Sequence, residues 1–115
     1  MSRAQAPRRN EPPAAAGPAL HGLADRLRAA APELRTHGIT ALSLFGSTAR
    51  GEAKAGSDVD ILIDPRPGQR FSLFDLGEVR VRLSELLGRQ VDLLVREDLR
   101  PDLRQRIEAD LLPVF

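Results

Sequence analysis

Two short stretches decide what this chain folds into: LFGSTARGE at residues 44–52 and SDVDILID at residues 57–64. The first ends an apolar run on Gly-Ser, and the second begins an apolar run on two aspartates, Asp58 and Asp60. Side chains of a β-strand alternate between its faces, so both carboxylates share one face of a predicted strand. Water or a divalent cation makes such a pair tolerable, and a small-residue loop offers backbone N–H groups to phosphate. The two stretches together indicate a site for a polyphosphate and its metal ion.

The composition is that of one small domain. The chain has 115 residues, of which 42% are hydrophobic and 29% charged, and its formal net charge is +1. It has no obvious basic face for a nucleic-acid backbone, and the absence of Trp and Tyr argues against a base-stacking surface. Without cysteine, disulfides and thiolate metal sites are excluded. No apolar run reaches the ~20 residues of a membrane span and no secretory signal is present, so we expect a cytoplasmic protein.

Hydrophobic periodicity and turn residues divide the chain into elements. Residues 1–17 are rich in Pro, Ala and Arg and lack periodicity, so we expect a disordered tail before a domain at residues 18–115. Apolar spacing predicts a first helix from Pro18 that ends or kinks at Pro32. A long helix is predicted between an N-cap at Ser72 and a stop at Gly88. The other predicted elements are strands at 39–45, 59–63 and 90–95, a short helix at 47–52 and a last helix at 101–109.

The order of these elements predicts an α+β fold, with a small mixed β-sheet and helices packed on one face. The first two strands are joined by a helical loop too short for a full crossover, whereas a complete helix separates the second strand from the third. The apolar tail at residues 111–115 is either a further strand or a packed end of the chain.

The third predicted strand carries one acid, Asp92, inside the apolar run VDLLV. A carboxylate in such a strand costs several kcal/mol if it is buried without a partner. If this strand lies beside the strand at residues 59–63, Asp92 faces the same side as Asp58 and Asp60, and three carboxylates converge. Oxygen ligands without His or Cys indicate a site for a divalent metal ion.

These residues resemble a known family, the minimal nucleotidyltransferases (MNT type) of the DNA polymerase beta-like superfamily. The resemblance extends from about residue 20 to the C-terminus and implies the polymerase beta-like nucleotidyltransferase fold. The motifs that carry it are Gly46-Ser47, Arg50-Gly51-Glu52 and Ser57-Asp58-x-Asp60, with Asp92 in the place of the third acid.

The resemblance implies a transfer of AMP from ATP that uses two Mg²⁺ ions. The residues implied as catalytic and metal-binding are Asp58, Asp60 and Asp92, and those implied as nucleotide-binding are Gly46, Ser47 and Arg50. The first two acids would each hold Mg²⁺, while the third would complete the acceptor-side ion and take the proton of the acceptor hydroxyl. Arg50 would contact phosphate or instead pair with Glu52, and both alternatives stay open.

A chain this small has little with which to enclose a base or to choose an acceptor, so we expect it to dimerise or to use a partner. Minimal nucleotidyltransferases are commonly paired with helical HEPN-domain proteins in toxin–antitoxin modules. The resemblance therefore implies an antitoxin that transfers AMP to a hydroxyl, that of a tyrosine, on a HEPN toxin. Two alternatives stay open: a small-molecule nucleotidyltransferase of the aminoglycoside-modifying kind, and a non-catalytic antitoxin that masks the surface of its toxin.

Overall fold

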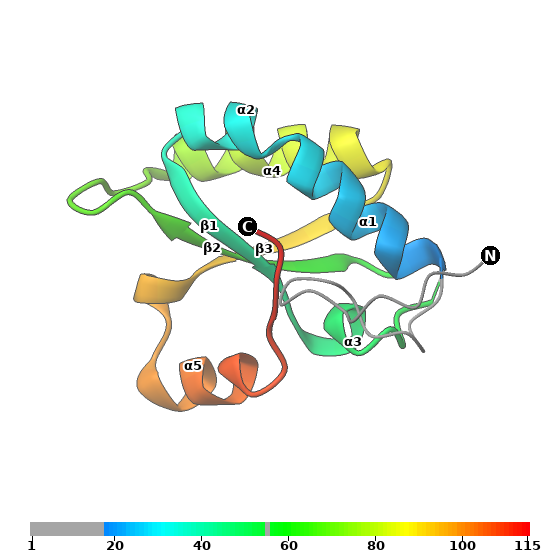
Figure 1. Cartoon of the computed structure of the whole chain (residues 1–115). Helices are drawn as coiled ribbons and strands as arrows, with labels where there is room; N and C mark the ends of the chain where they lie inside the picture. Colours follow the sequence, from blue (N-terminus) through cyan, green and yellow to red (C-terminus); the bar gives the residue numbers. More distant parts are fainter. Residues whose placement is uncertain (1–17, 55) are drawn as a thin grey trace.

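The computed structural model describes residues 18–54 and 56–115 (Figure 1). The expected tail at residues 1–17 lies outside this part of the chain. None of the helices in the described part is long and apolar enough to cross a membrane. In chain order the elements are α1 (Pro18–Ala29), α2 (Ala31–Thr36), β1 (Ile39–Leu44), α3 (Gly46–Ala49), β2 (Val59–Pro65), α4 (Leu73–Leu87), β3 (Val91–Val95), the 3₁₀ turn η2 (Arg96–Asp98), α5 (Pro101–Glu108) and β4 (Leu112–Pro113).

The sheet is mixed, as predicted, with the strand order β3-β2-β1-β4. β1 runs antiparallel to both β2 and β4, whereas β2 and β3 run parallel. Parallel neighbours need a long crossover, which α4 supplies, while the short α3 segment allows β1 and β2 to pair antiparallel. The C-terminal tail is a strand rather than a mere packed end, because the N–H of Val114 donates to the carbonyl of Leu42 at 2.8 Å beyond the β4 ladder.

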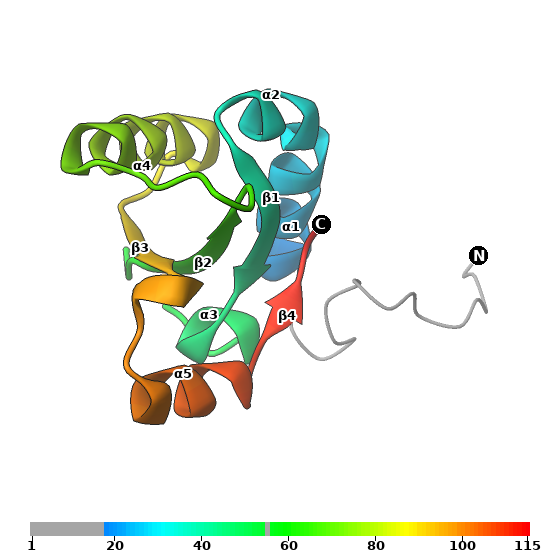
Figure 2. The ribbon, with the colours of Figure 1, turned by 90° about the vertical axis from the view of Figure 1, so that its left-hand side faces the viewer.

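Helices lie on both faces of this sheet. α1, α2 and α4 cover one face, as predicted, and α5 lies with α3 on the other (Figures 1 and 2). The larger hydrophobic cluster includes Ile61 of β2 and Leu83 of α4, and a smaller one joins Leu62 of β2 to Ile107 of α5. The fold class is confirmed. α3 and α5 are the exceptions to the predicted one-face arrangement, and α5 packs there through Ile107, its only buried residue.

The caps of α4 confirm the predicted bounds of this crossover helix. The hydroxyl of Ser72 accepts a hydrogen bond from the N–H of Asp75 at 3.0 Å, and the N–H of Ser72 donates to the Asp75 carboxylate at 2.9 Å. These bonds favour the ionised carboxylate and lower the pKa of Asp75. Gly88 ends the helix in the left-handed region, with φ of 66°. The crossover that delivers β3 next to β2 therefore begins and ends at residues that local sequence specifies.

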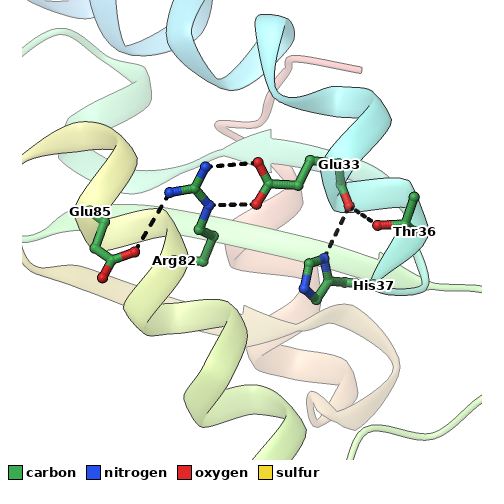
Figure 3. A network of polar contacts seen from close by, with 5 residues as sticks. All are labelled: Glu33, Thr36, His37, Arg82 and Glu85. Atoms are coloured by element: carbon green, nitrogen blue, oxygen red, sulfur yellow. Dashed lines mark hydrogen bonds and ion pairs between the residues drawn. The ribbon is translucent and has the colours of Figure 1, made fainter.

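A forked ion pair joins α4 to α2 (Figure 3). Arg82 donates through Nη2 to one carboxylate oxygen of Glu33 at 2.9 Å and through Nε to the other. The same guanidinium lies 3.6 Å from the carboxylate of Glu85. The hydrogen bond from Arg82 is the main cause of a lowered pKa at Glu33, and the charge of His37 adds a smaller effect. This contact fixes α2 and α4, which cover the same face of the sheet, relative to each other.

Candidate active site

The two faces of β2 have different chemistry. Val59, Ile61 and Ile63 are fully buried in the larger cluster beneath α1, α2 and α4. The alternate residues Asp60 and Leu62 face the side of α3 and α5, where Leu62 completes the smaller cluster. The polar residues of β2 thus lie on the less covered face of the sheet.

Asp60 is held by α3 through two hydrogen bonds to one side chain. The hydroxyl of Thr48 donates to Asp60 Oδ2 at 3.2 Å and accepts from the backbone N–H of Asp60 at 3.0 Å. Thr48 is only 3% exposed, so this exchange takes place out of contact with bulk water. The contact fixes the rotamer of the carboxylate and joins the end of β1 to the start of β2.

Gly46 brings the backbone directly against this carboxylate. Its φ of 59° lies in the left-handed region, which favours glycine. A Cβ at this position would lie 3.1 Å from Asp60 Oδ2, tighter than an ordinary van der Waals contact. The adjacent N–H of Phe45 donates to the carbonyl of Asp60 at 3.1 Å. The Gly46-Ser47 bend and Asp60, the first acid of β2, are therefore neighbours in space.

Asp92 lies on the neighbouring strand at the same level. In the parallel pairing of β2 with β3, Asp60 is the register partner of Asp92, and neighbouring strands are about 4.8 Å apart. Partial burial is the main cause of a raised pKa at Asp92, and the charges of Asp60 and then Asp58 raise it further. Asp58 lies directly before β2, two residues before Asp60. Its charge acts on the carboxylate of Asp92. The charges of Asp60 and Asp58 thus both act on Asp92.

These acids fit a divalent metal ion shared with a ligand. Among residues 18–54 and 56–115, no group of three or more His, Asp or Glu side chains is arranged so that it could hold a metal ion by itself. Mg²⁺ is commonly bound by one or two carboxylates together with water and substrate phosphates, rather than by a complete protein cage. Carboxylates that raise the pKa of a neighbour, with no His or Cys in the group, are suited to such a hard cation.

Arg89 supports the loop that leads to Asp58. Its Nη2 donates to the carbonyl oxygens of Lys54 at 3.1 Å and Ser57 at 2.6 Å. The N–H of Val59 donates to the carbonyl of Gln90 at 2.9 Å just beyond. These hydrogen bonds connect the segment before β3 to the segment before β2, and so fix the position of Asp58 relative to Asp92.

Arg50 lies at the end of α3, held by two carboxylates. Its Nε donates to Glu52 at 3.0 Å and its Nη1 donates to Asp110 at 2.8 Å. These two hydrogen bonds are the main cause of a raised pKa at Arg50. The pairing with Glu52 is thus observed, and the contact with phosphate stays a prediction. Arg50 also lines a cavity of about 440 Å³ between α3 and α5, together with Phe45, Gly46, Leu103, Arg106, Ile107 and Asp110.

The structure brings most of the predicted residues to one place and adds others. Gly46, Asp60 and Asp92 lie together, Asp58 acts on Asp92, and the half-buried Ser47 follows Gly46 in α3. Their roles in binding and catalysis stay predictions. Sequence reasoning missed Thr48, Arg89 and Asp110. Thr48 follows Gly46-Ser47 directly, and this position is a signal that could have indicated its role beside Asp60. No local sequence pattern links Arg50 to Asp110.

The chain matches the family model of the nucleotidyltransferase domain over residues 25–114. It is 42% identical to a candidate protein adenylyltransferase of Methanocaldococcus jannaschii over 73% of this chain and 88% of that protein. It is also 37% identical to the protein adenylyltransferase MntA of Thermococcus cleftensis, over 71% of this chain and 82% of that protein.

Two solved structures have similar folds. One is the structure of a candidate minimal nucleotidyltransferase, which is 34% identical to this chain with a TM-score of 0.71. The match covers 82% of this chain and 94% of that chain. The other is the structure of a tri-AMPylated HEPN toxin of Shewanella oneidensis in complex with MNT antitoxin. A chain of that complex is 19% identical to this chain with a TM-score of 0.61, and the match covers 81% of this chain and 71% of that chain. The resemblance to the minimal nucleotidyltransferases is confirmed, and this chain belongs to the nucleotidyltransferase domain family.

Proposed function

We propose that this chain is a Mg²⁺-dependent protein adenylyltransferase that acts as an antitoxin in the cytoplasm. It would transfer AMP from ATP to the hydroxyl of a tyrosine on a partner HEPN toxin. The names of its relatives and the toxin–antitoxin complex of similar fold support this proposal. The observation that carries it is the pairing of Asp60 with Asp92 at one level of the sheet, with the Gly46 bend against Asp60.

The Gly46 bend is suited to the phosphates of ATP. The first hydrogen bonds of α3 are donated by the N–H groups of Ala49 and Arg50, to Phe45 and Gly46, each at 3.2 Å. The preceding N–H groups lie outside this pattern and are available to phosphate oxygens, and the Ser47 hydroxyl adds a further donor. The guanidinium of Arg50 carries more N–H donors than its two carboxylate contacts use. Held at the rim of the adjacent cavity, it would bind phosphate in a fixed orientation.

The acids would hold the metal and receive the proton. Asp58, Asp60 and Asp92 would bind two Mg²⁺ ions, which when bound neutralise charge on the triphosphate and on the entering oxygen. The acceptor hydroxyl forms a bond to the α-phosphorus, the bond from that phosphorus to the β-bridging oxygen breaks, and pyrophosphate leaves. The hydroxyl proton would pass to Asp92, the acid that the family resemblance places on the acceptor side.

The test uses the purified chain, ATP, Mg²⁺ and the purified product of the adjacent gene. We expect the intact mass of that product to increase by one or more AMP units, and EDTA to prevent the increase. The doubly substituted chain with Asp58→Asn and Asp60→Asn should fold and leave the product unmodified. An adjacent-gene product that binds the chain but gains no AMP overturns the proposal.

A non-catalytic antitoxin is the second candidate, because α4 exposes large apolar side chains that suit a protein interface. Masking of a toxin by binding alone survives replacement of the acids, whereas neutralisation by AMP transfer does not. Growth rescue by the Asp58→Ala, Asp60→Ala chain, co-expressed with the adjacent gene's product, separates the two: full rescue would establish masking.

A further inference from the structure

The outer face of α4 carries an apolar stripe that nothing in the described part of the chain covers. Leu73 and Phe74 are each 87% exposed, and Val81, about two turns along, is 56% exposed. They line a groove of about 530 Å³ on the surface of the helix. Large apolar side chains grouped along one helix face mark an interaction surface more often than singly scattered ones do.

Gly77 lies in the middle of this stripe and has no role in the packing of the chain itself. A Cβ there would meet no atom within 4 Å, and its φ is not positive. Glycine is a poor helix former, so its presence in the interior of a fifteen-residue helix lowers the stability of α4. Open space above a glycine, flanked by Phe74 and Val81, is what a closely approaching helix requires.

The charges at the rim of the groove select the kind of partner. Within residues 18–54 and 56–115, neither Glu78 nor Arg80 makes an ion pair, whereas Arg82 is turned to Glu33 and Glu85. An antiparallel pair of α4 helices related by a two-fold axis at Gly77 would bring the same edge of both helices together. Glu78 of one copy would then lie beside Glu78 of the other, which is repulsive. The groove therefore suits a different chain better than a second copy of this one.

We infer that this α4 face docks an amphipathic helix of the partner protein. That helix places a large apolar side chain over Gly77, a basic residue toward Glu78 and an acidic residue toward Arg80. The inference rests on the proposed function for the identity of the partner, the adjacent gene's product. Figure 2 shows α4 on the face of the sheet opposite α3 and α5. Asp60 is bonded to Thr48 of α3 and is the register partner of Asp92, so a partner docked on α4 leaves both acids uncovered.

The test measures binding of the purified adjacent-gene product by calorimetry without nucleotide. We expect Phe74→Glu to weaken binding at least about tenfold, and Gln105→Glu, which adds the same charge at an exposed position of α5, to leave it unchanged. Gly77→Ala is the sharper variant: it should raise the Tm of the free chain by a few degrees and still weaken binding, because its methyl group occupies the space of the partner helix.

Each outcome decides the inference. Wild-type affinity in both Phe74→Glu and Gly77→Ala overturns it, and AMP transfer measured on the same samples decides the proposed function separately. A wild-type chain that does not bind the product also overturns this docking. A dimer of the free chain that Phe74→Glu dissociates, seen by light scattering, overturns it in favour of a second copy.

Discussion

Asp60 of β2 lies opposite Asp92 of β3 in a parallel strand pair, so two acidic side chains lie at one level of the sheet. Partial burial, and then the charges of Asp60 and Asp58, raise the pKa of Asp92. Carboxyl groups whose pKa is raised by burial together with neighbouring charges are often found in functional sites.

Asp92→Asn should greatly lower the rate of AMP transfer and stabilise the fold. Loss of the proton acceptor lowers the rate of AMP transfer by about 10²- to 10⁴-fold. A carboxyl group whose folded pKa is raised destabilises the folded state once the pH exceeds its unfolded pKa, about 3.9. The Tm should therefore increase in the variant at pH 7, and the increase should vanish as the pH falls to that range. An unchanged Tm at pH 7 would show that neither burial nor the neighbouring charges raise the pKa of Asp92 in the folded chain.

Gly46→Ala should damage both the bend and the acid beside it. A non-glycine residue in the left-handed region costs about 1–2 kcal/mol, and the new Cβ must displace Asp60 Oδ2 from 3.1 Å. We expect a transfer rate about ten- to a hundredfold lower. Gly68→Ala is the matched control, because Gly68 has φ of 82° and open space around it. It should lose comparable stability with full activity, and equal activities in the two variants would contradict the role given to Gly46.

Thr48→Val should leave Asp60 without its internal partner. The substitution keeps the volume but removes the hydroxyl that both donates to and accepts from Asp60. We expect the free energy of unfolding to fall by about 1–3 kcal/mol, measured by urea denaturation, with a parallel loss of transfer rate. Thr40→Val removes an exposed hydroxyl that bonds the Asp64 carbonyl at 3.1 Å. It should change neither quantity appreciably.

Glu33→Gln should reduce stability in a pH-dependent way. The hydrogen bond from Arg82 lowers the pKa of Glu33 in the folded state, so the stabilisation is present above the unfolded pKa. It is lost as the pH falls through the lower, folded pKa. Thermal melts should therefore show a lower Tm for the variant at pH 7 and converging Tm values in strong acid. Both side chains are part-exposed, so the difference should be small and should shrink in high salt. A difference independent of pH would exclude the ion pair as its cause.

Local sequence predicted the elements and most of the candidate site because each depends on neighbours in the chain. The capping box of α4 needs only Ser72 and Asp75, and its stop needs only Gly88. The shared face of Asp58 and Asp60 follows from strand alternation alone. Arg50 shows the limit of such reasoning. Its pairing with Glu52 joins residues two apart and can be expected from sequence, whereas its contact with Asp110 joins residues far apart in the chain.

The amino-acid sequence by itself determined where strands and helices begin, which side chains share a strand face, and that a glycine-serine bend precedes two acids. Only the tertiary structure decided that Asp92 pairs with Asp60, that Thr48 holds that acid, and that α5 lies on the same side of the sheet as the site. The physical reason is that periodicity and caps arise from interactions within a few residues. Strand register and helix placement depend instead on how distant apolar faces pack, which no single stretch of sequence records.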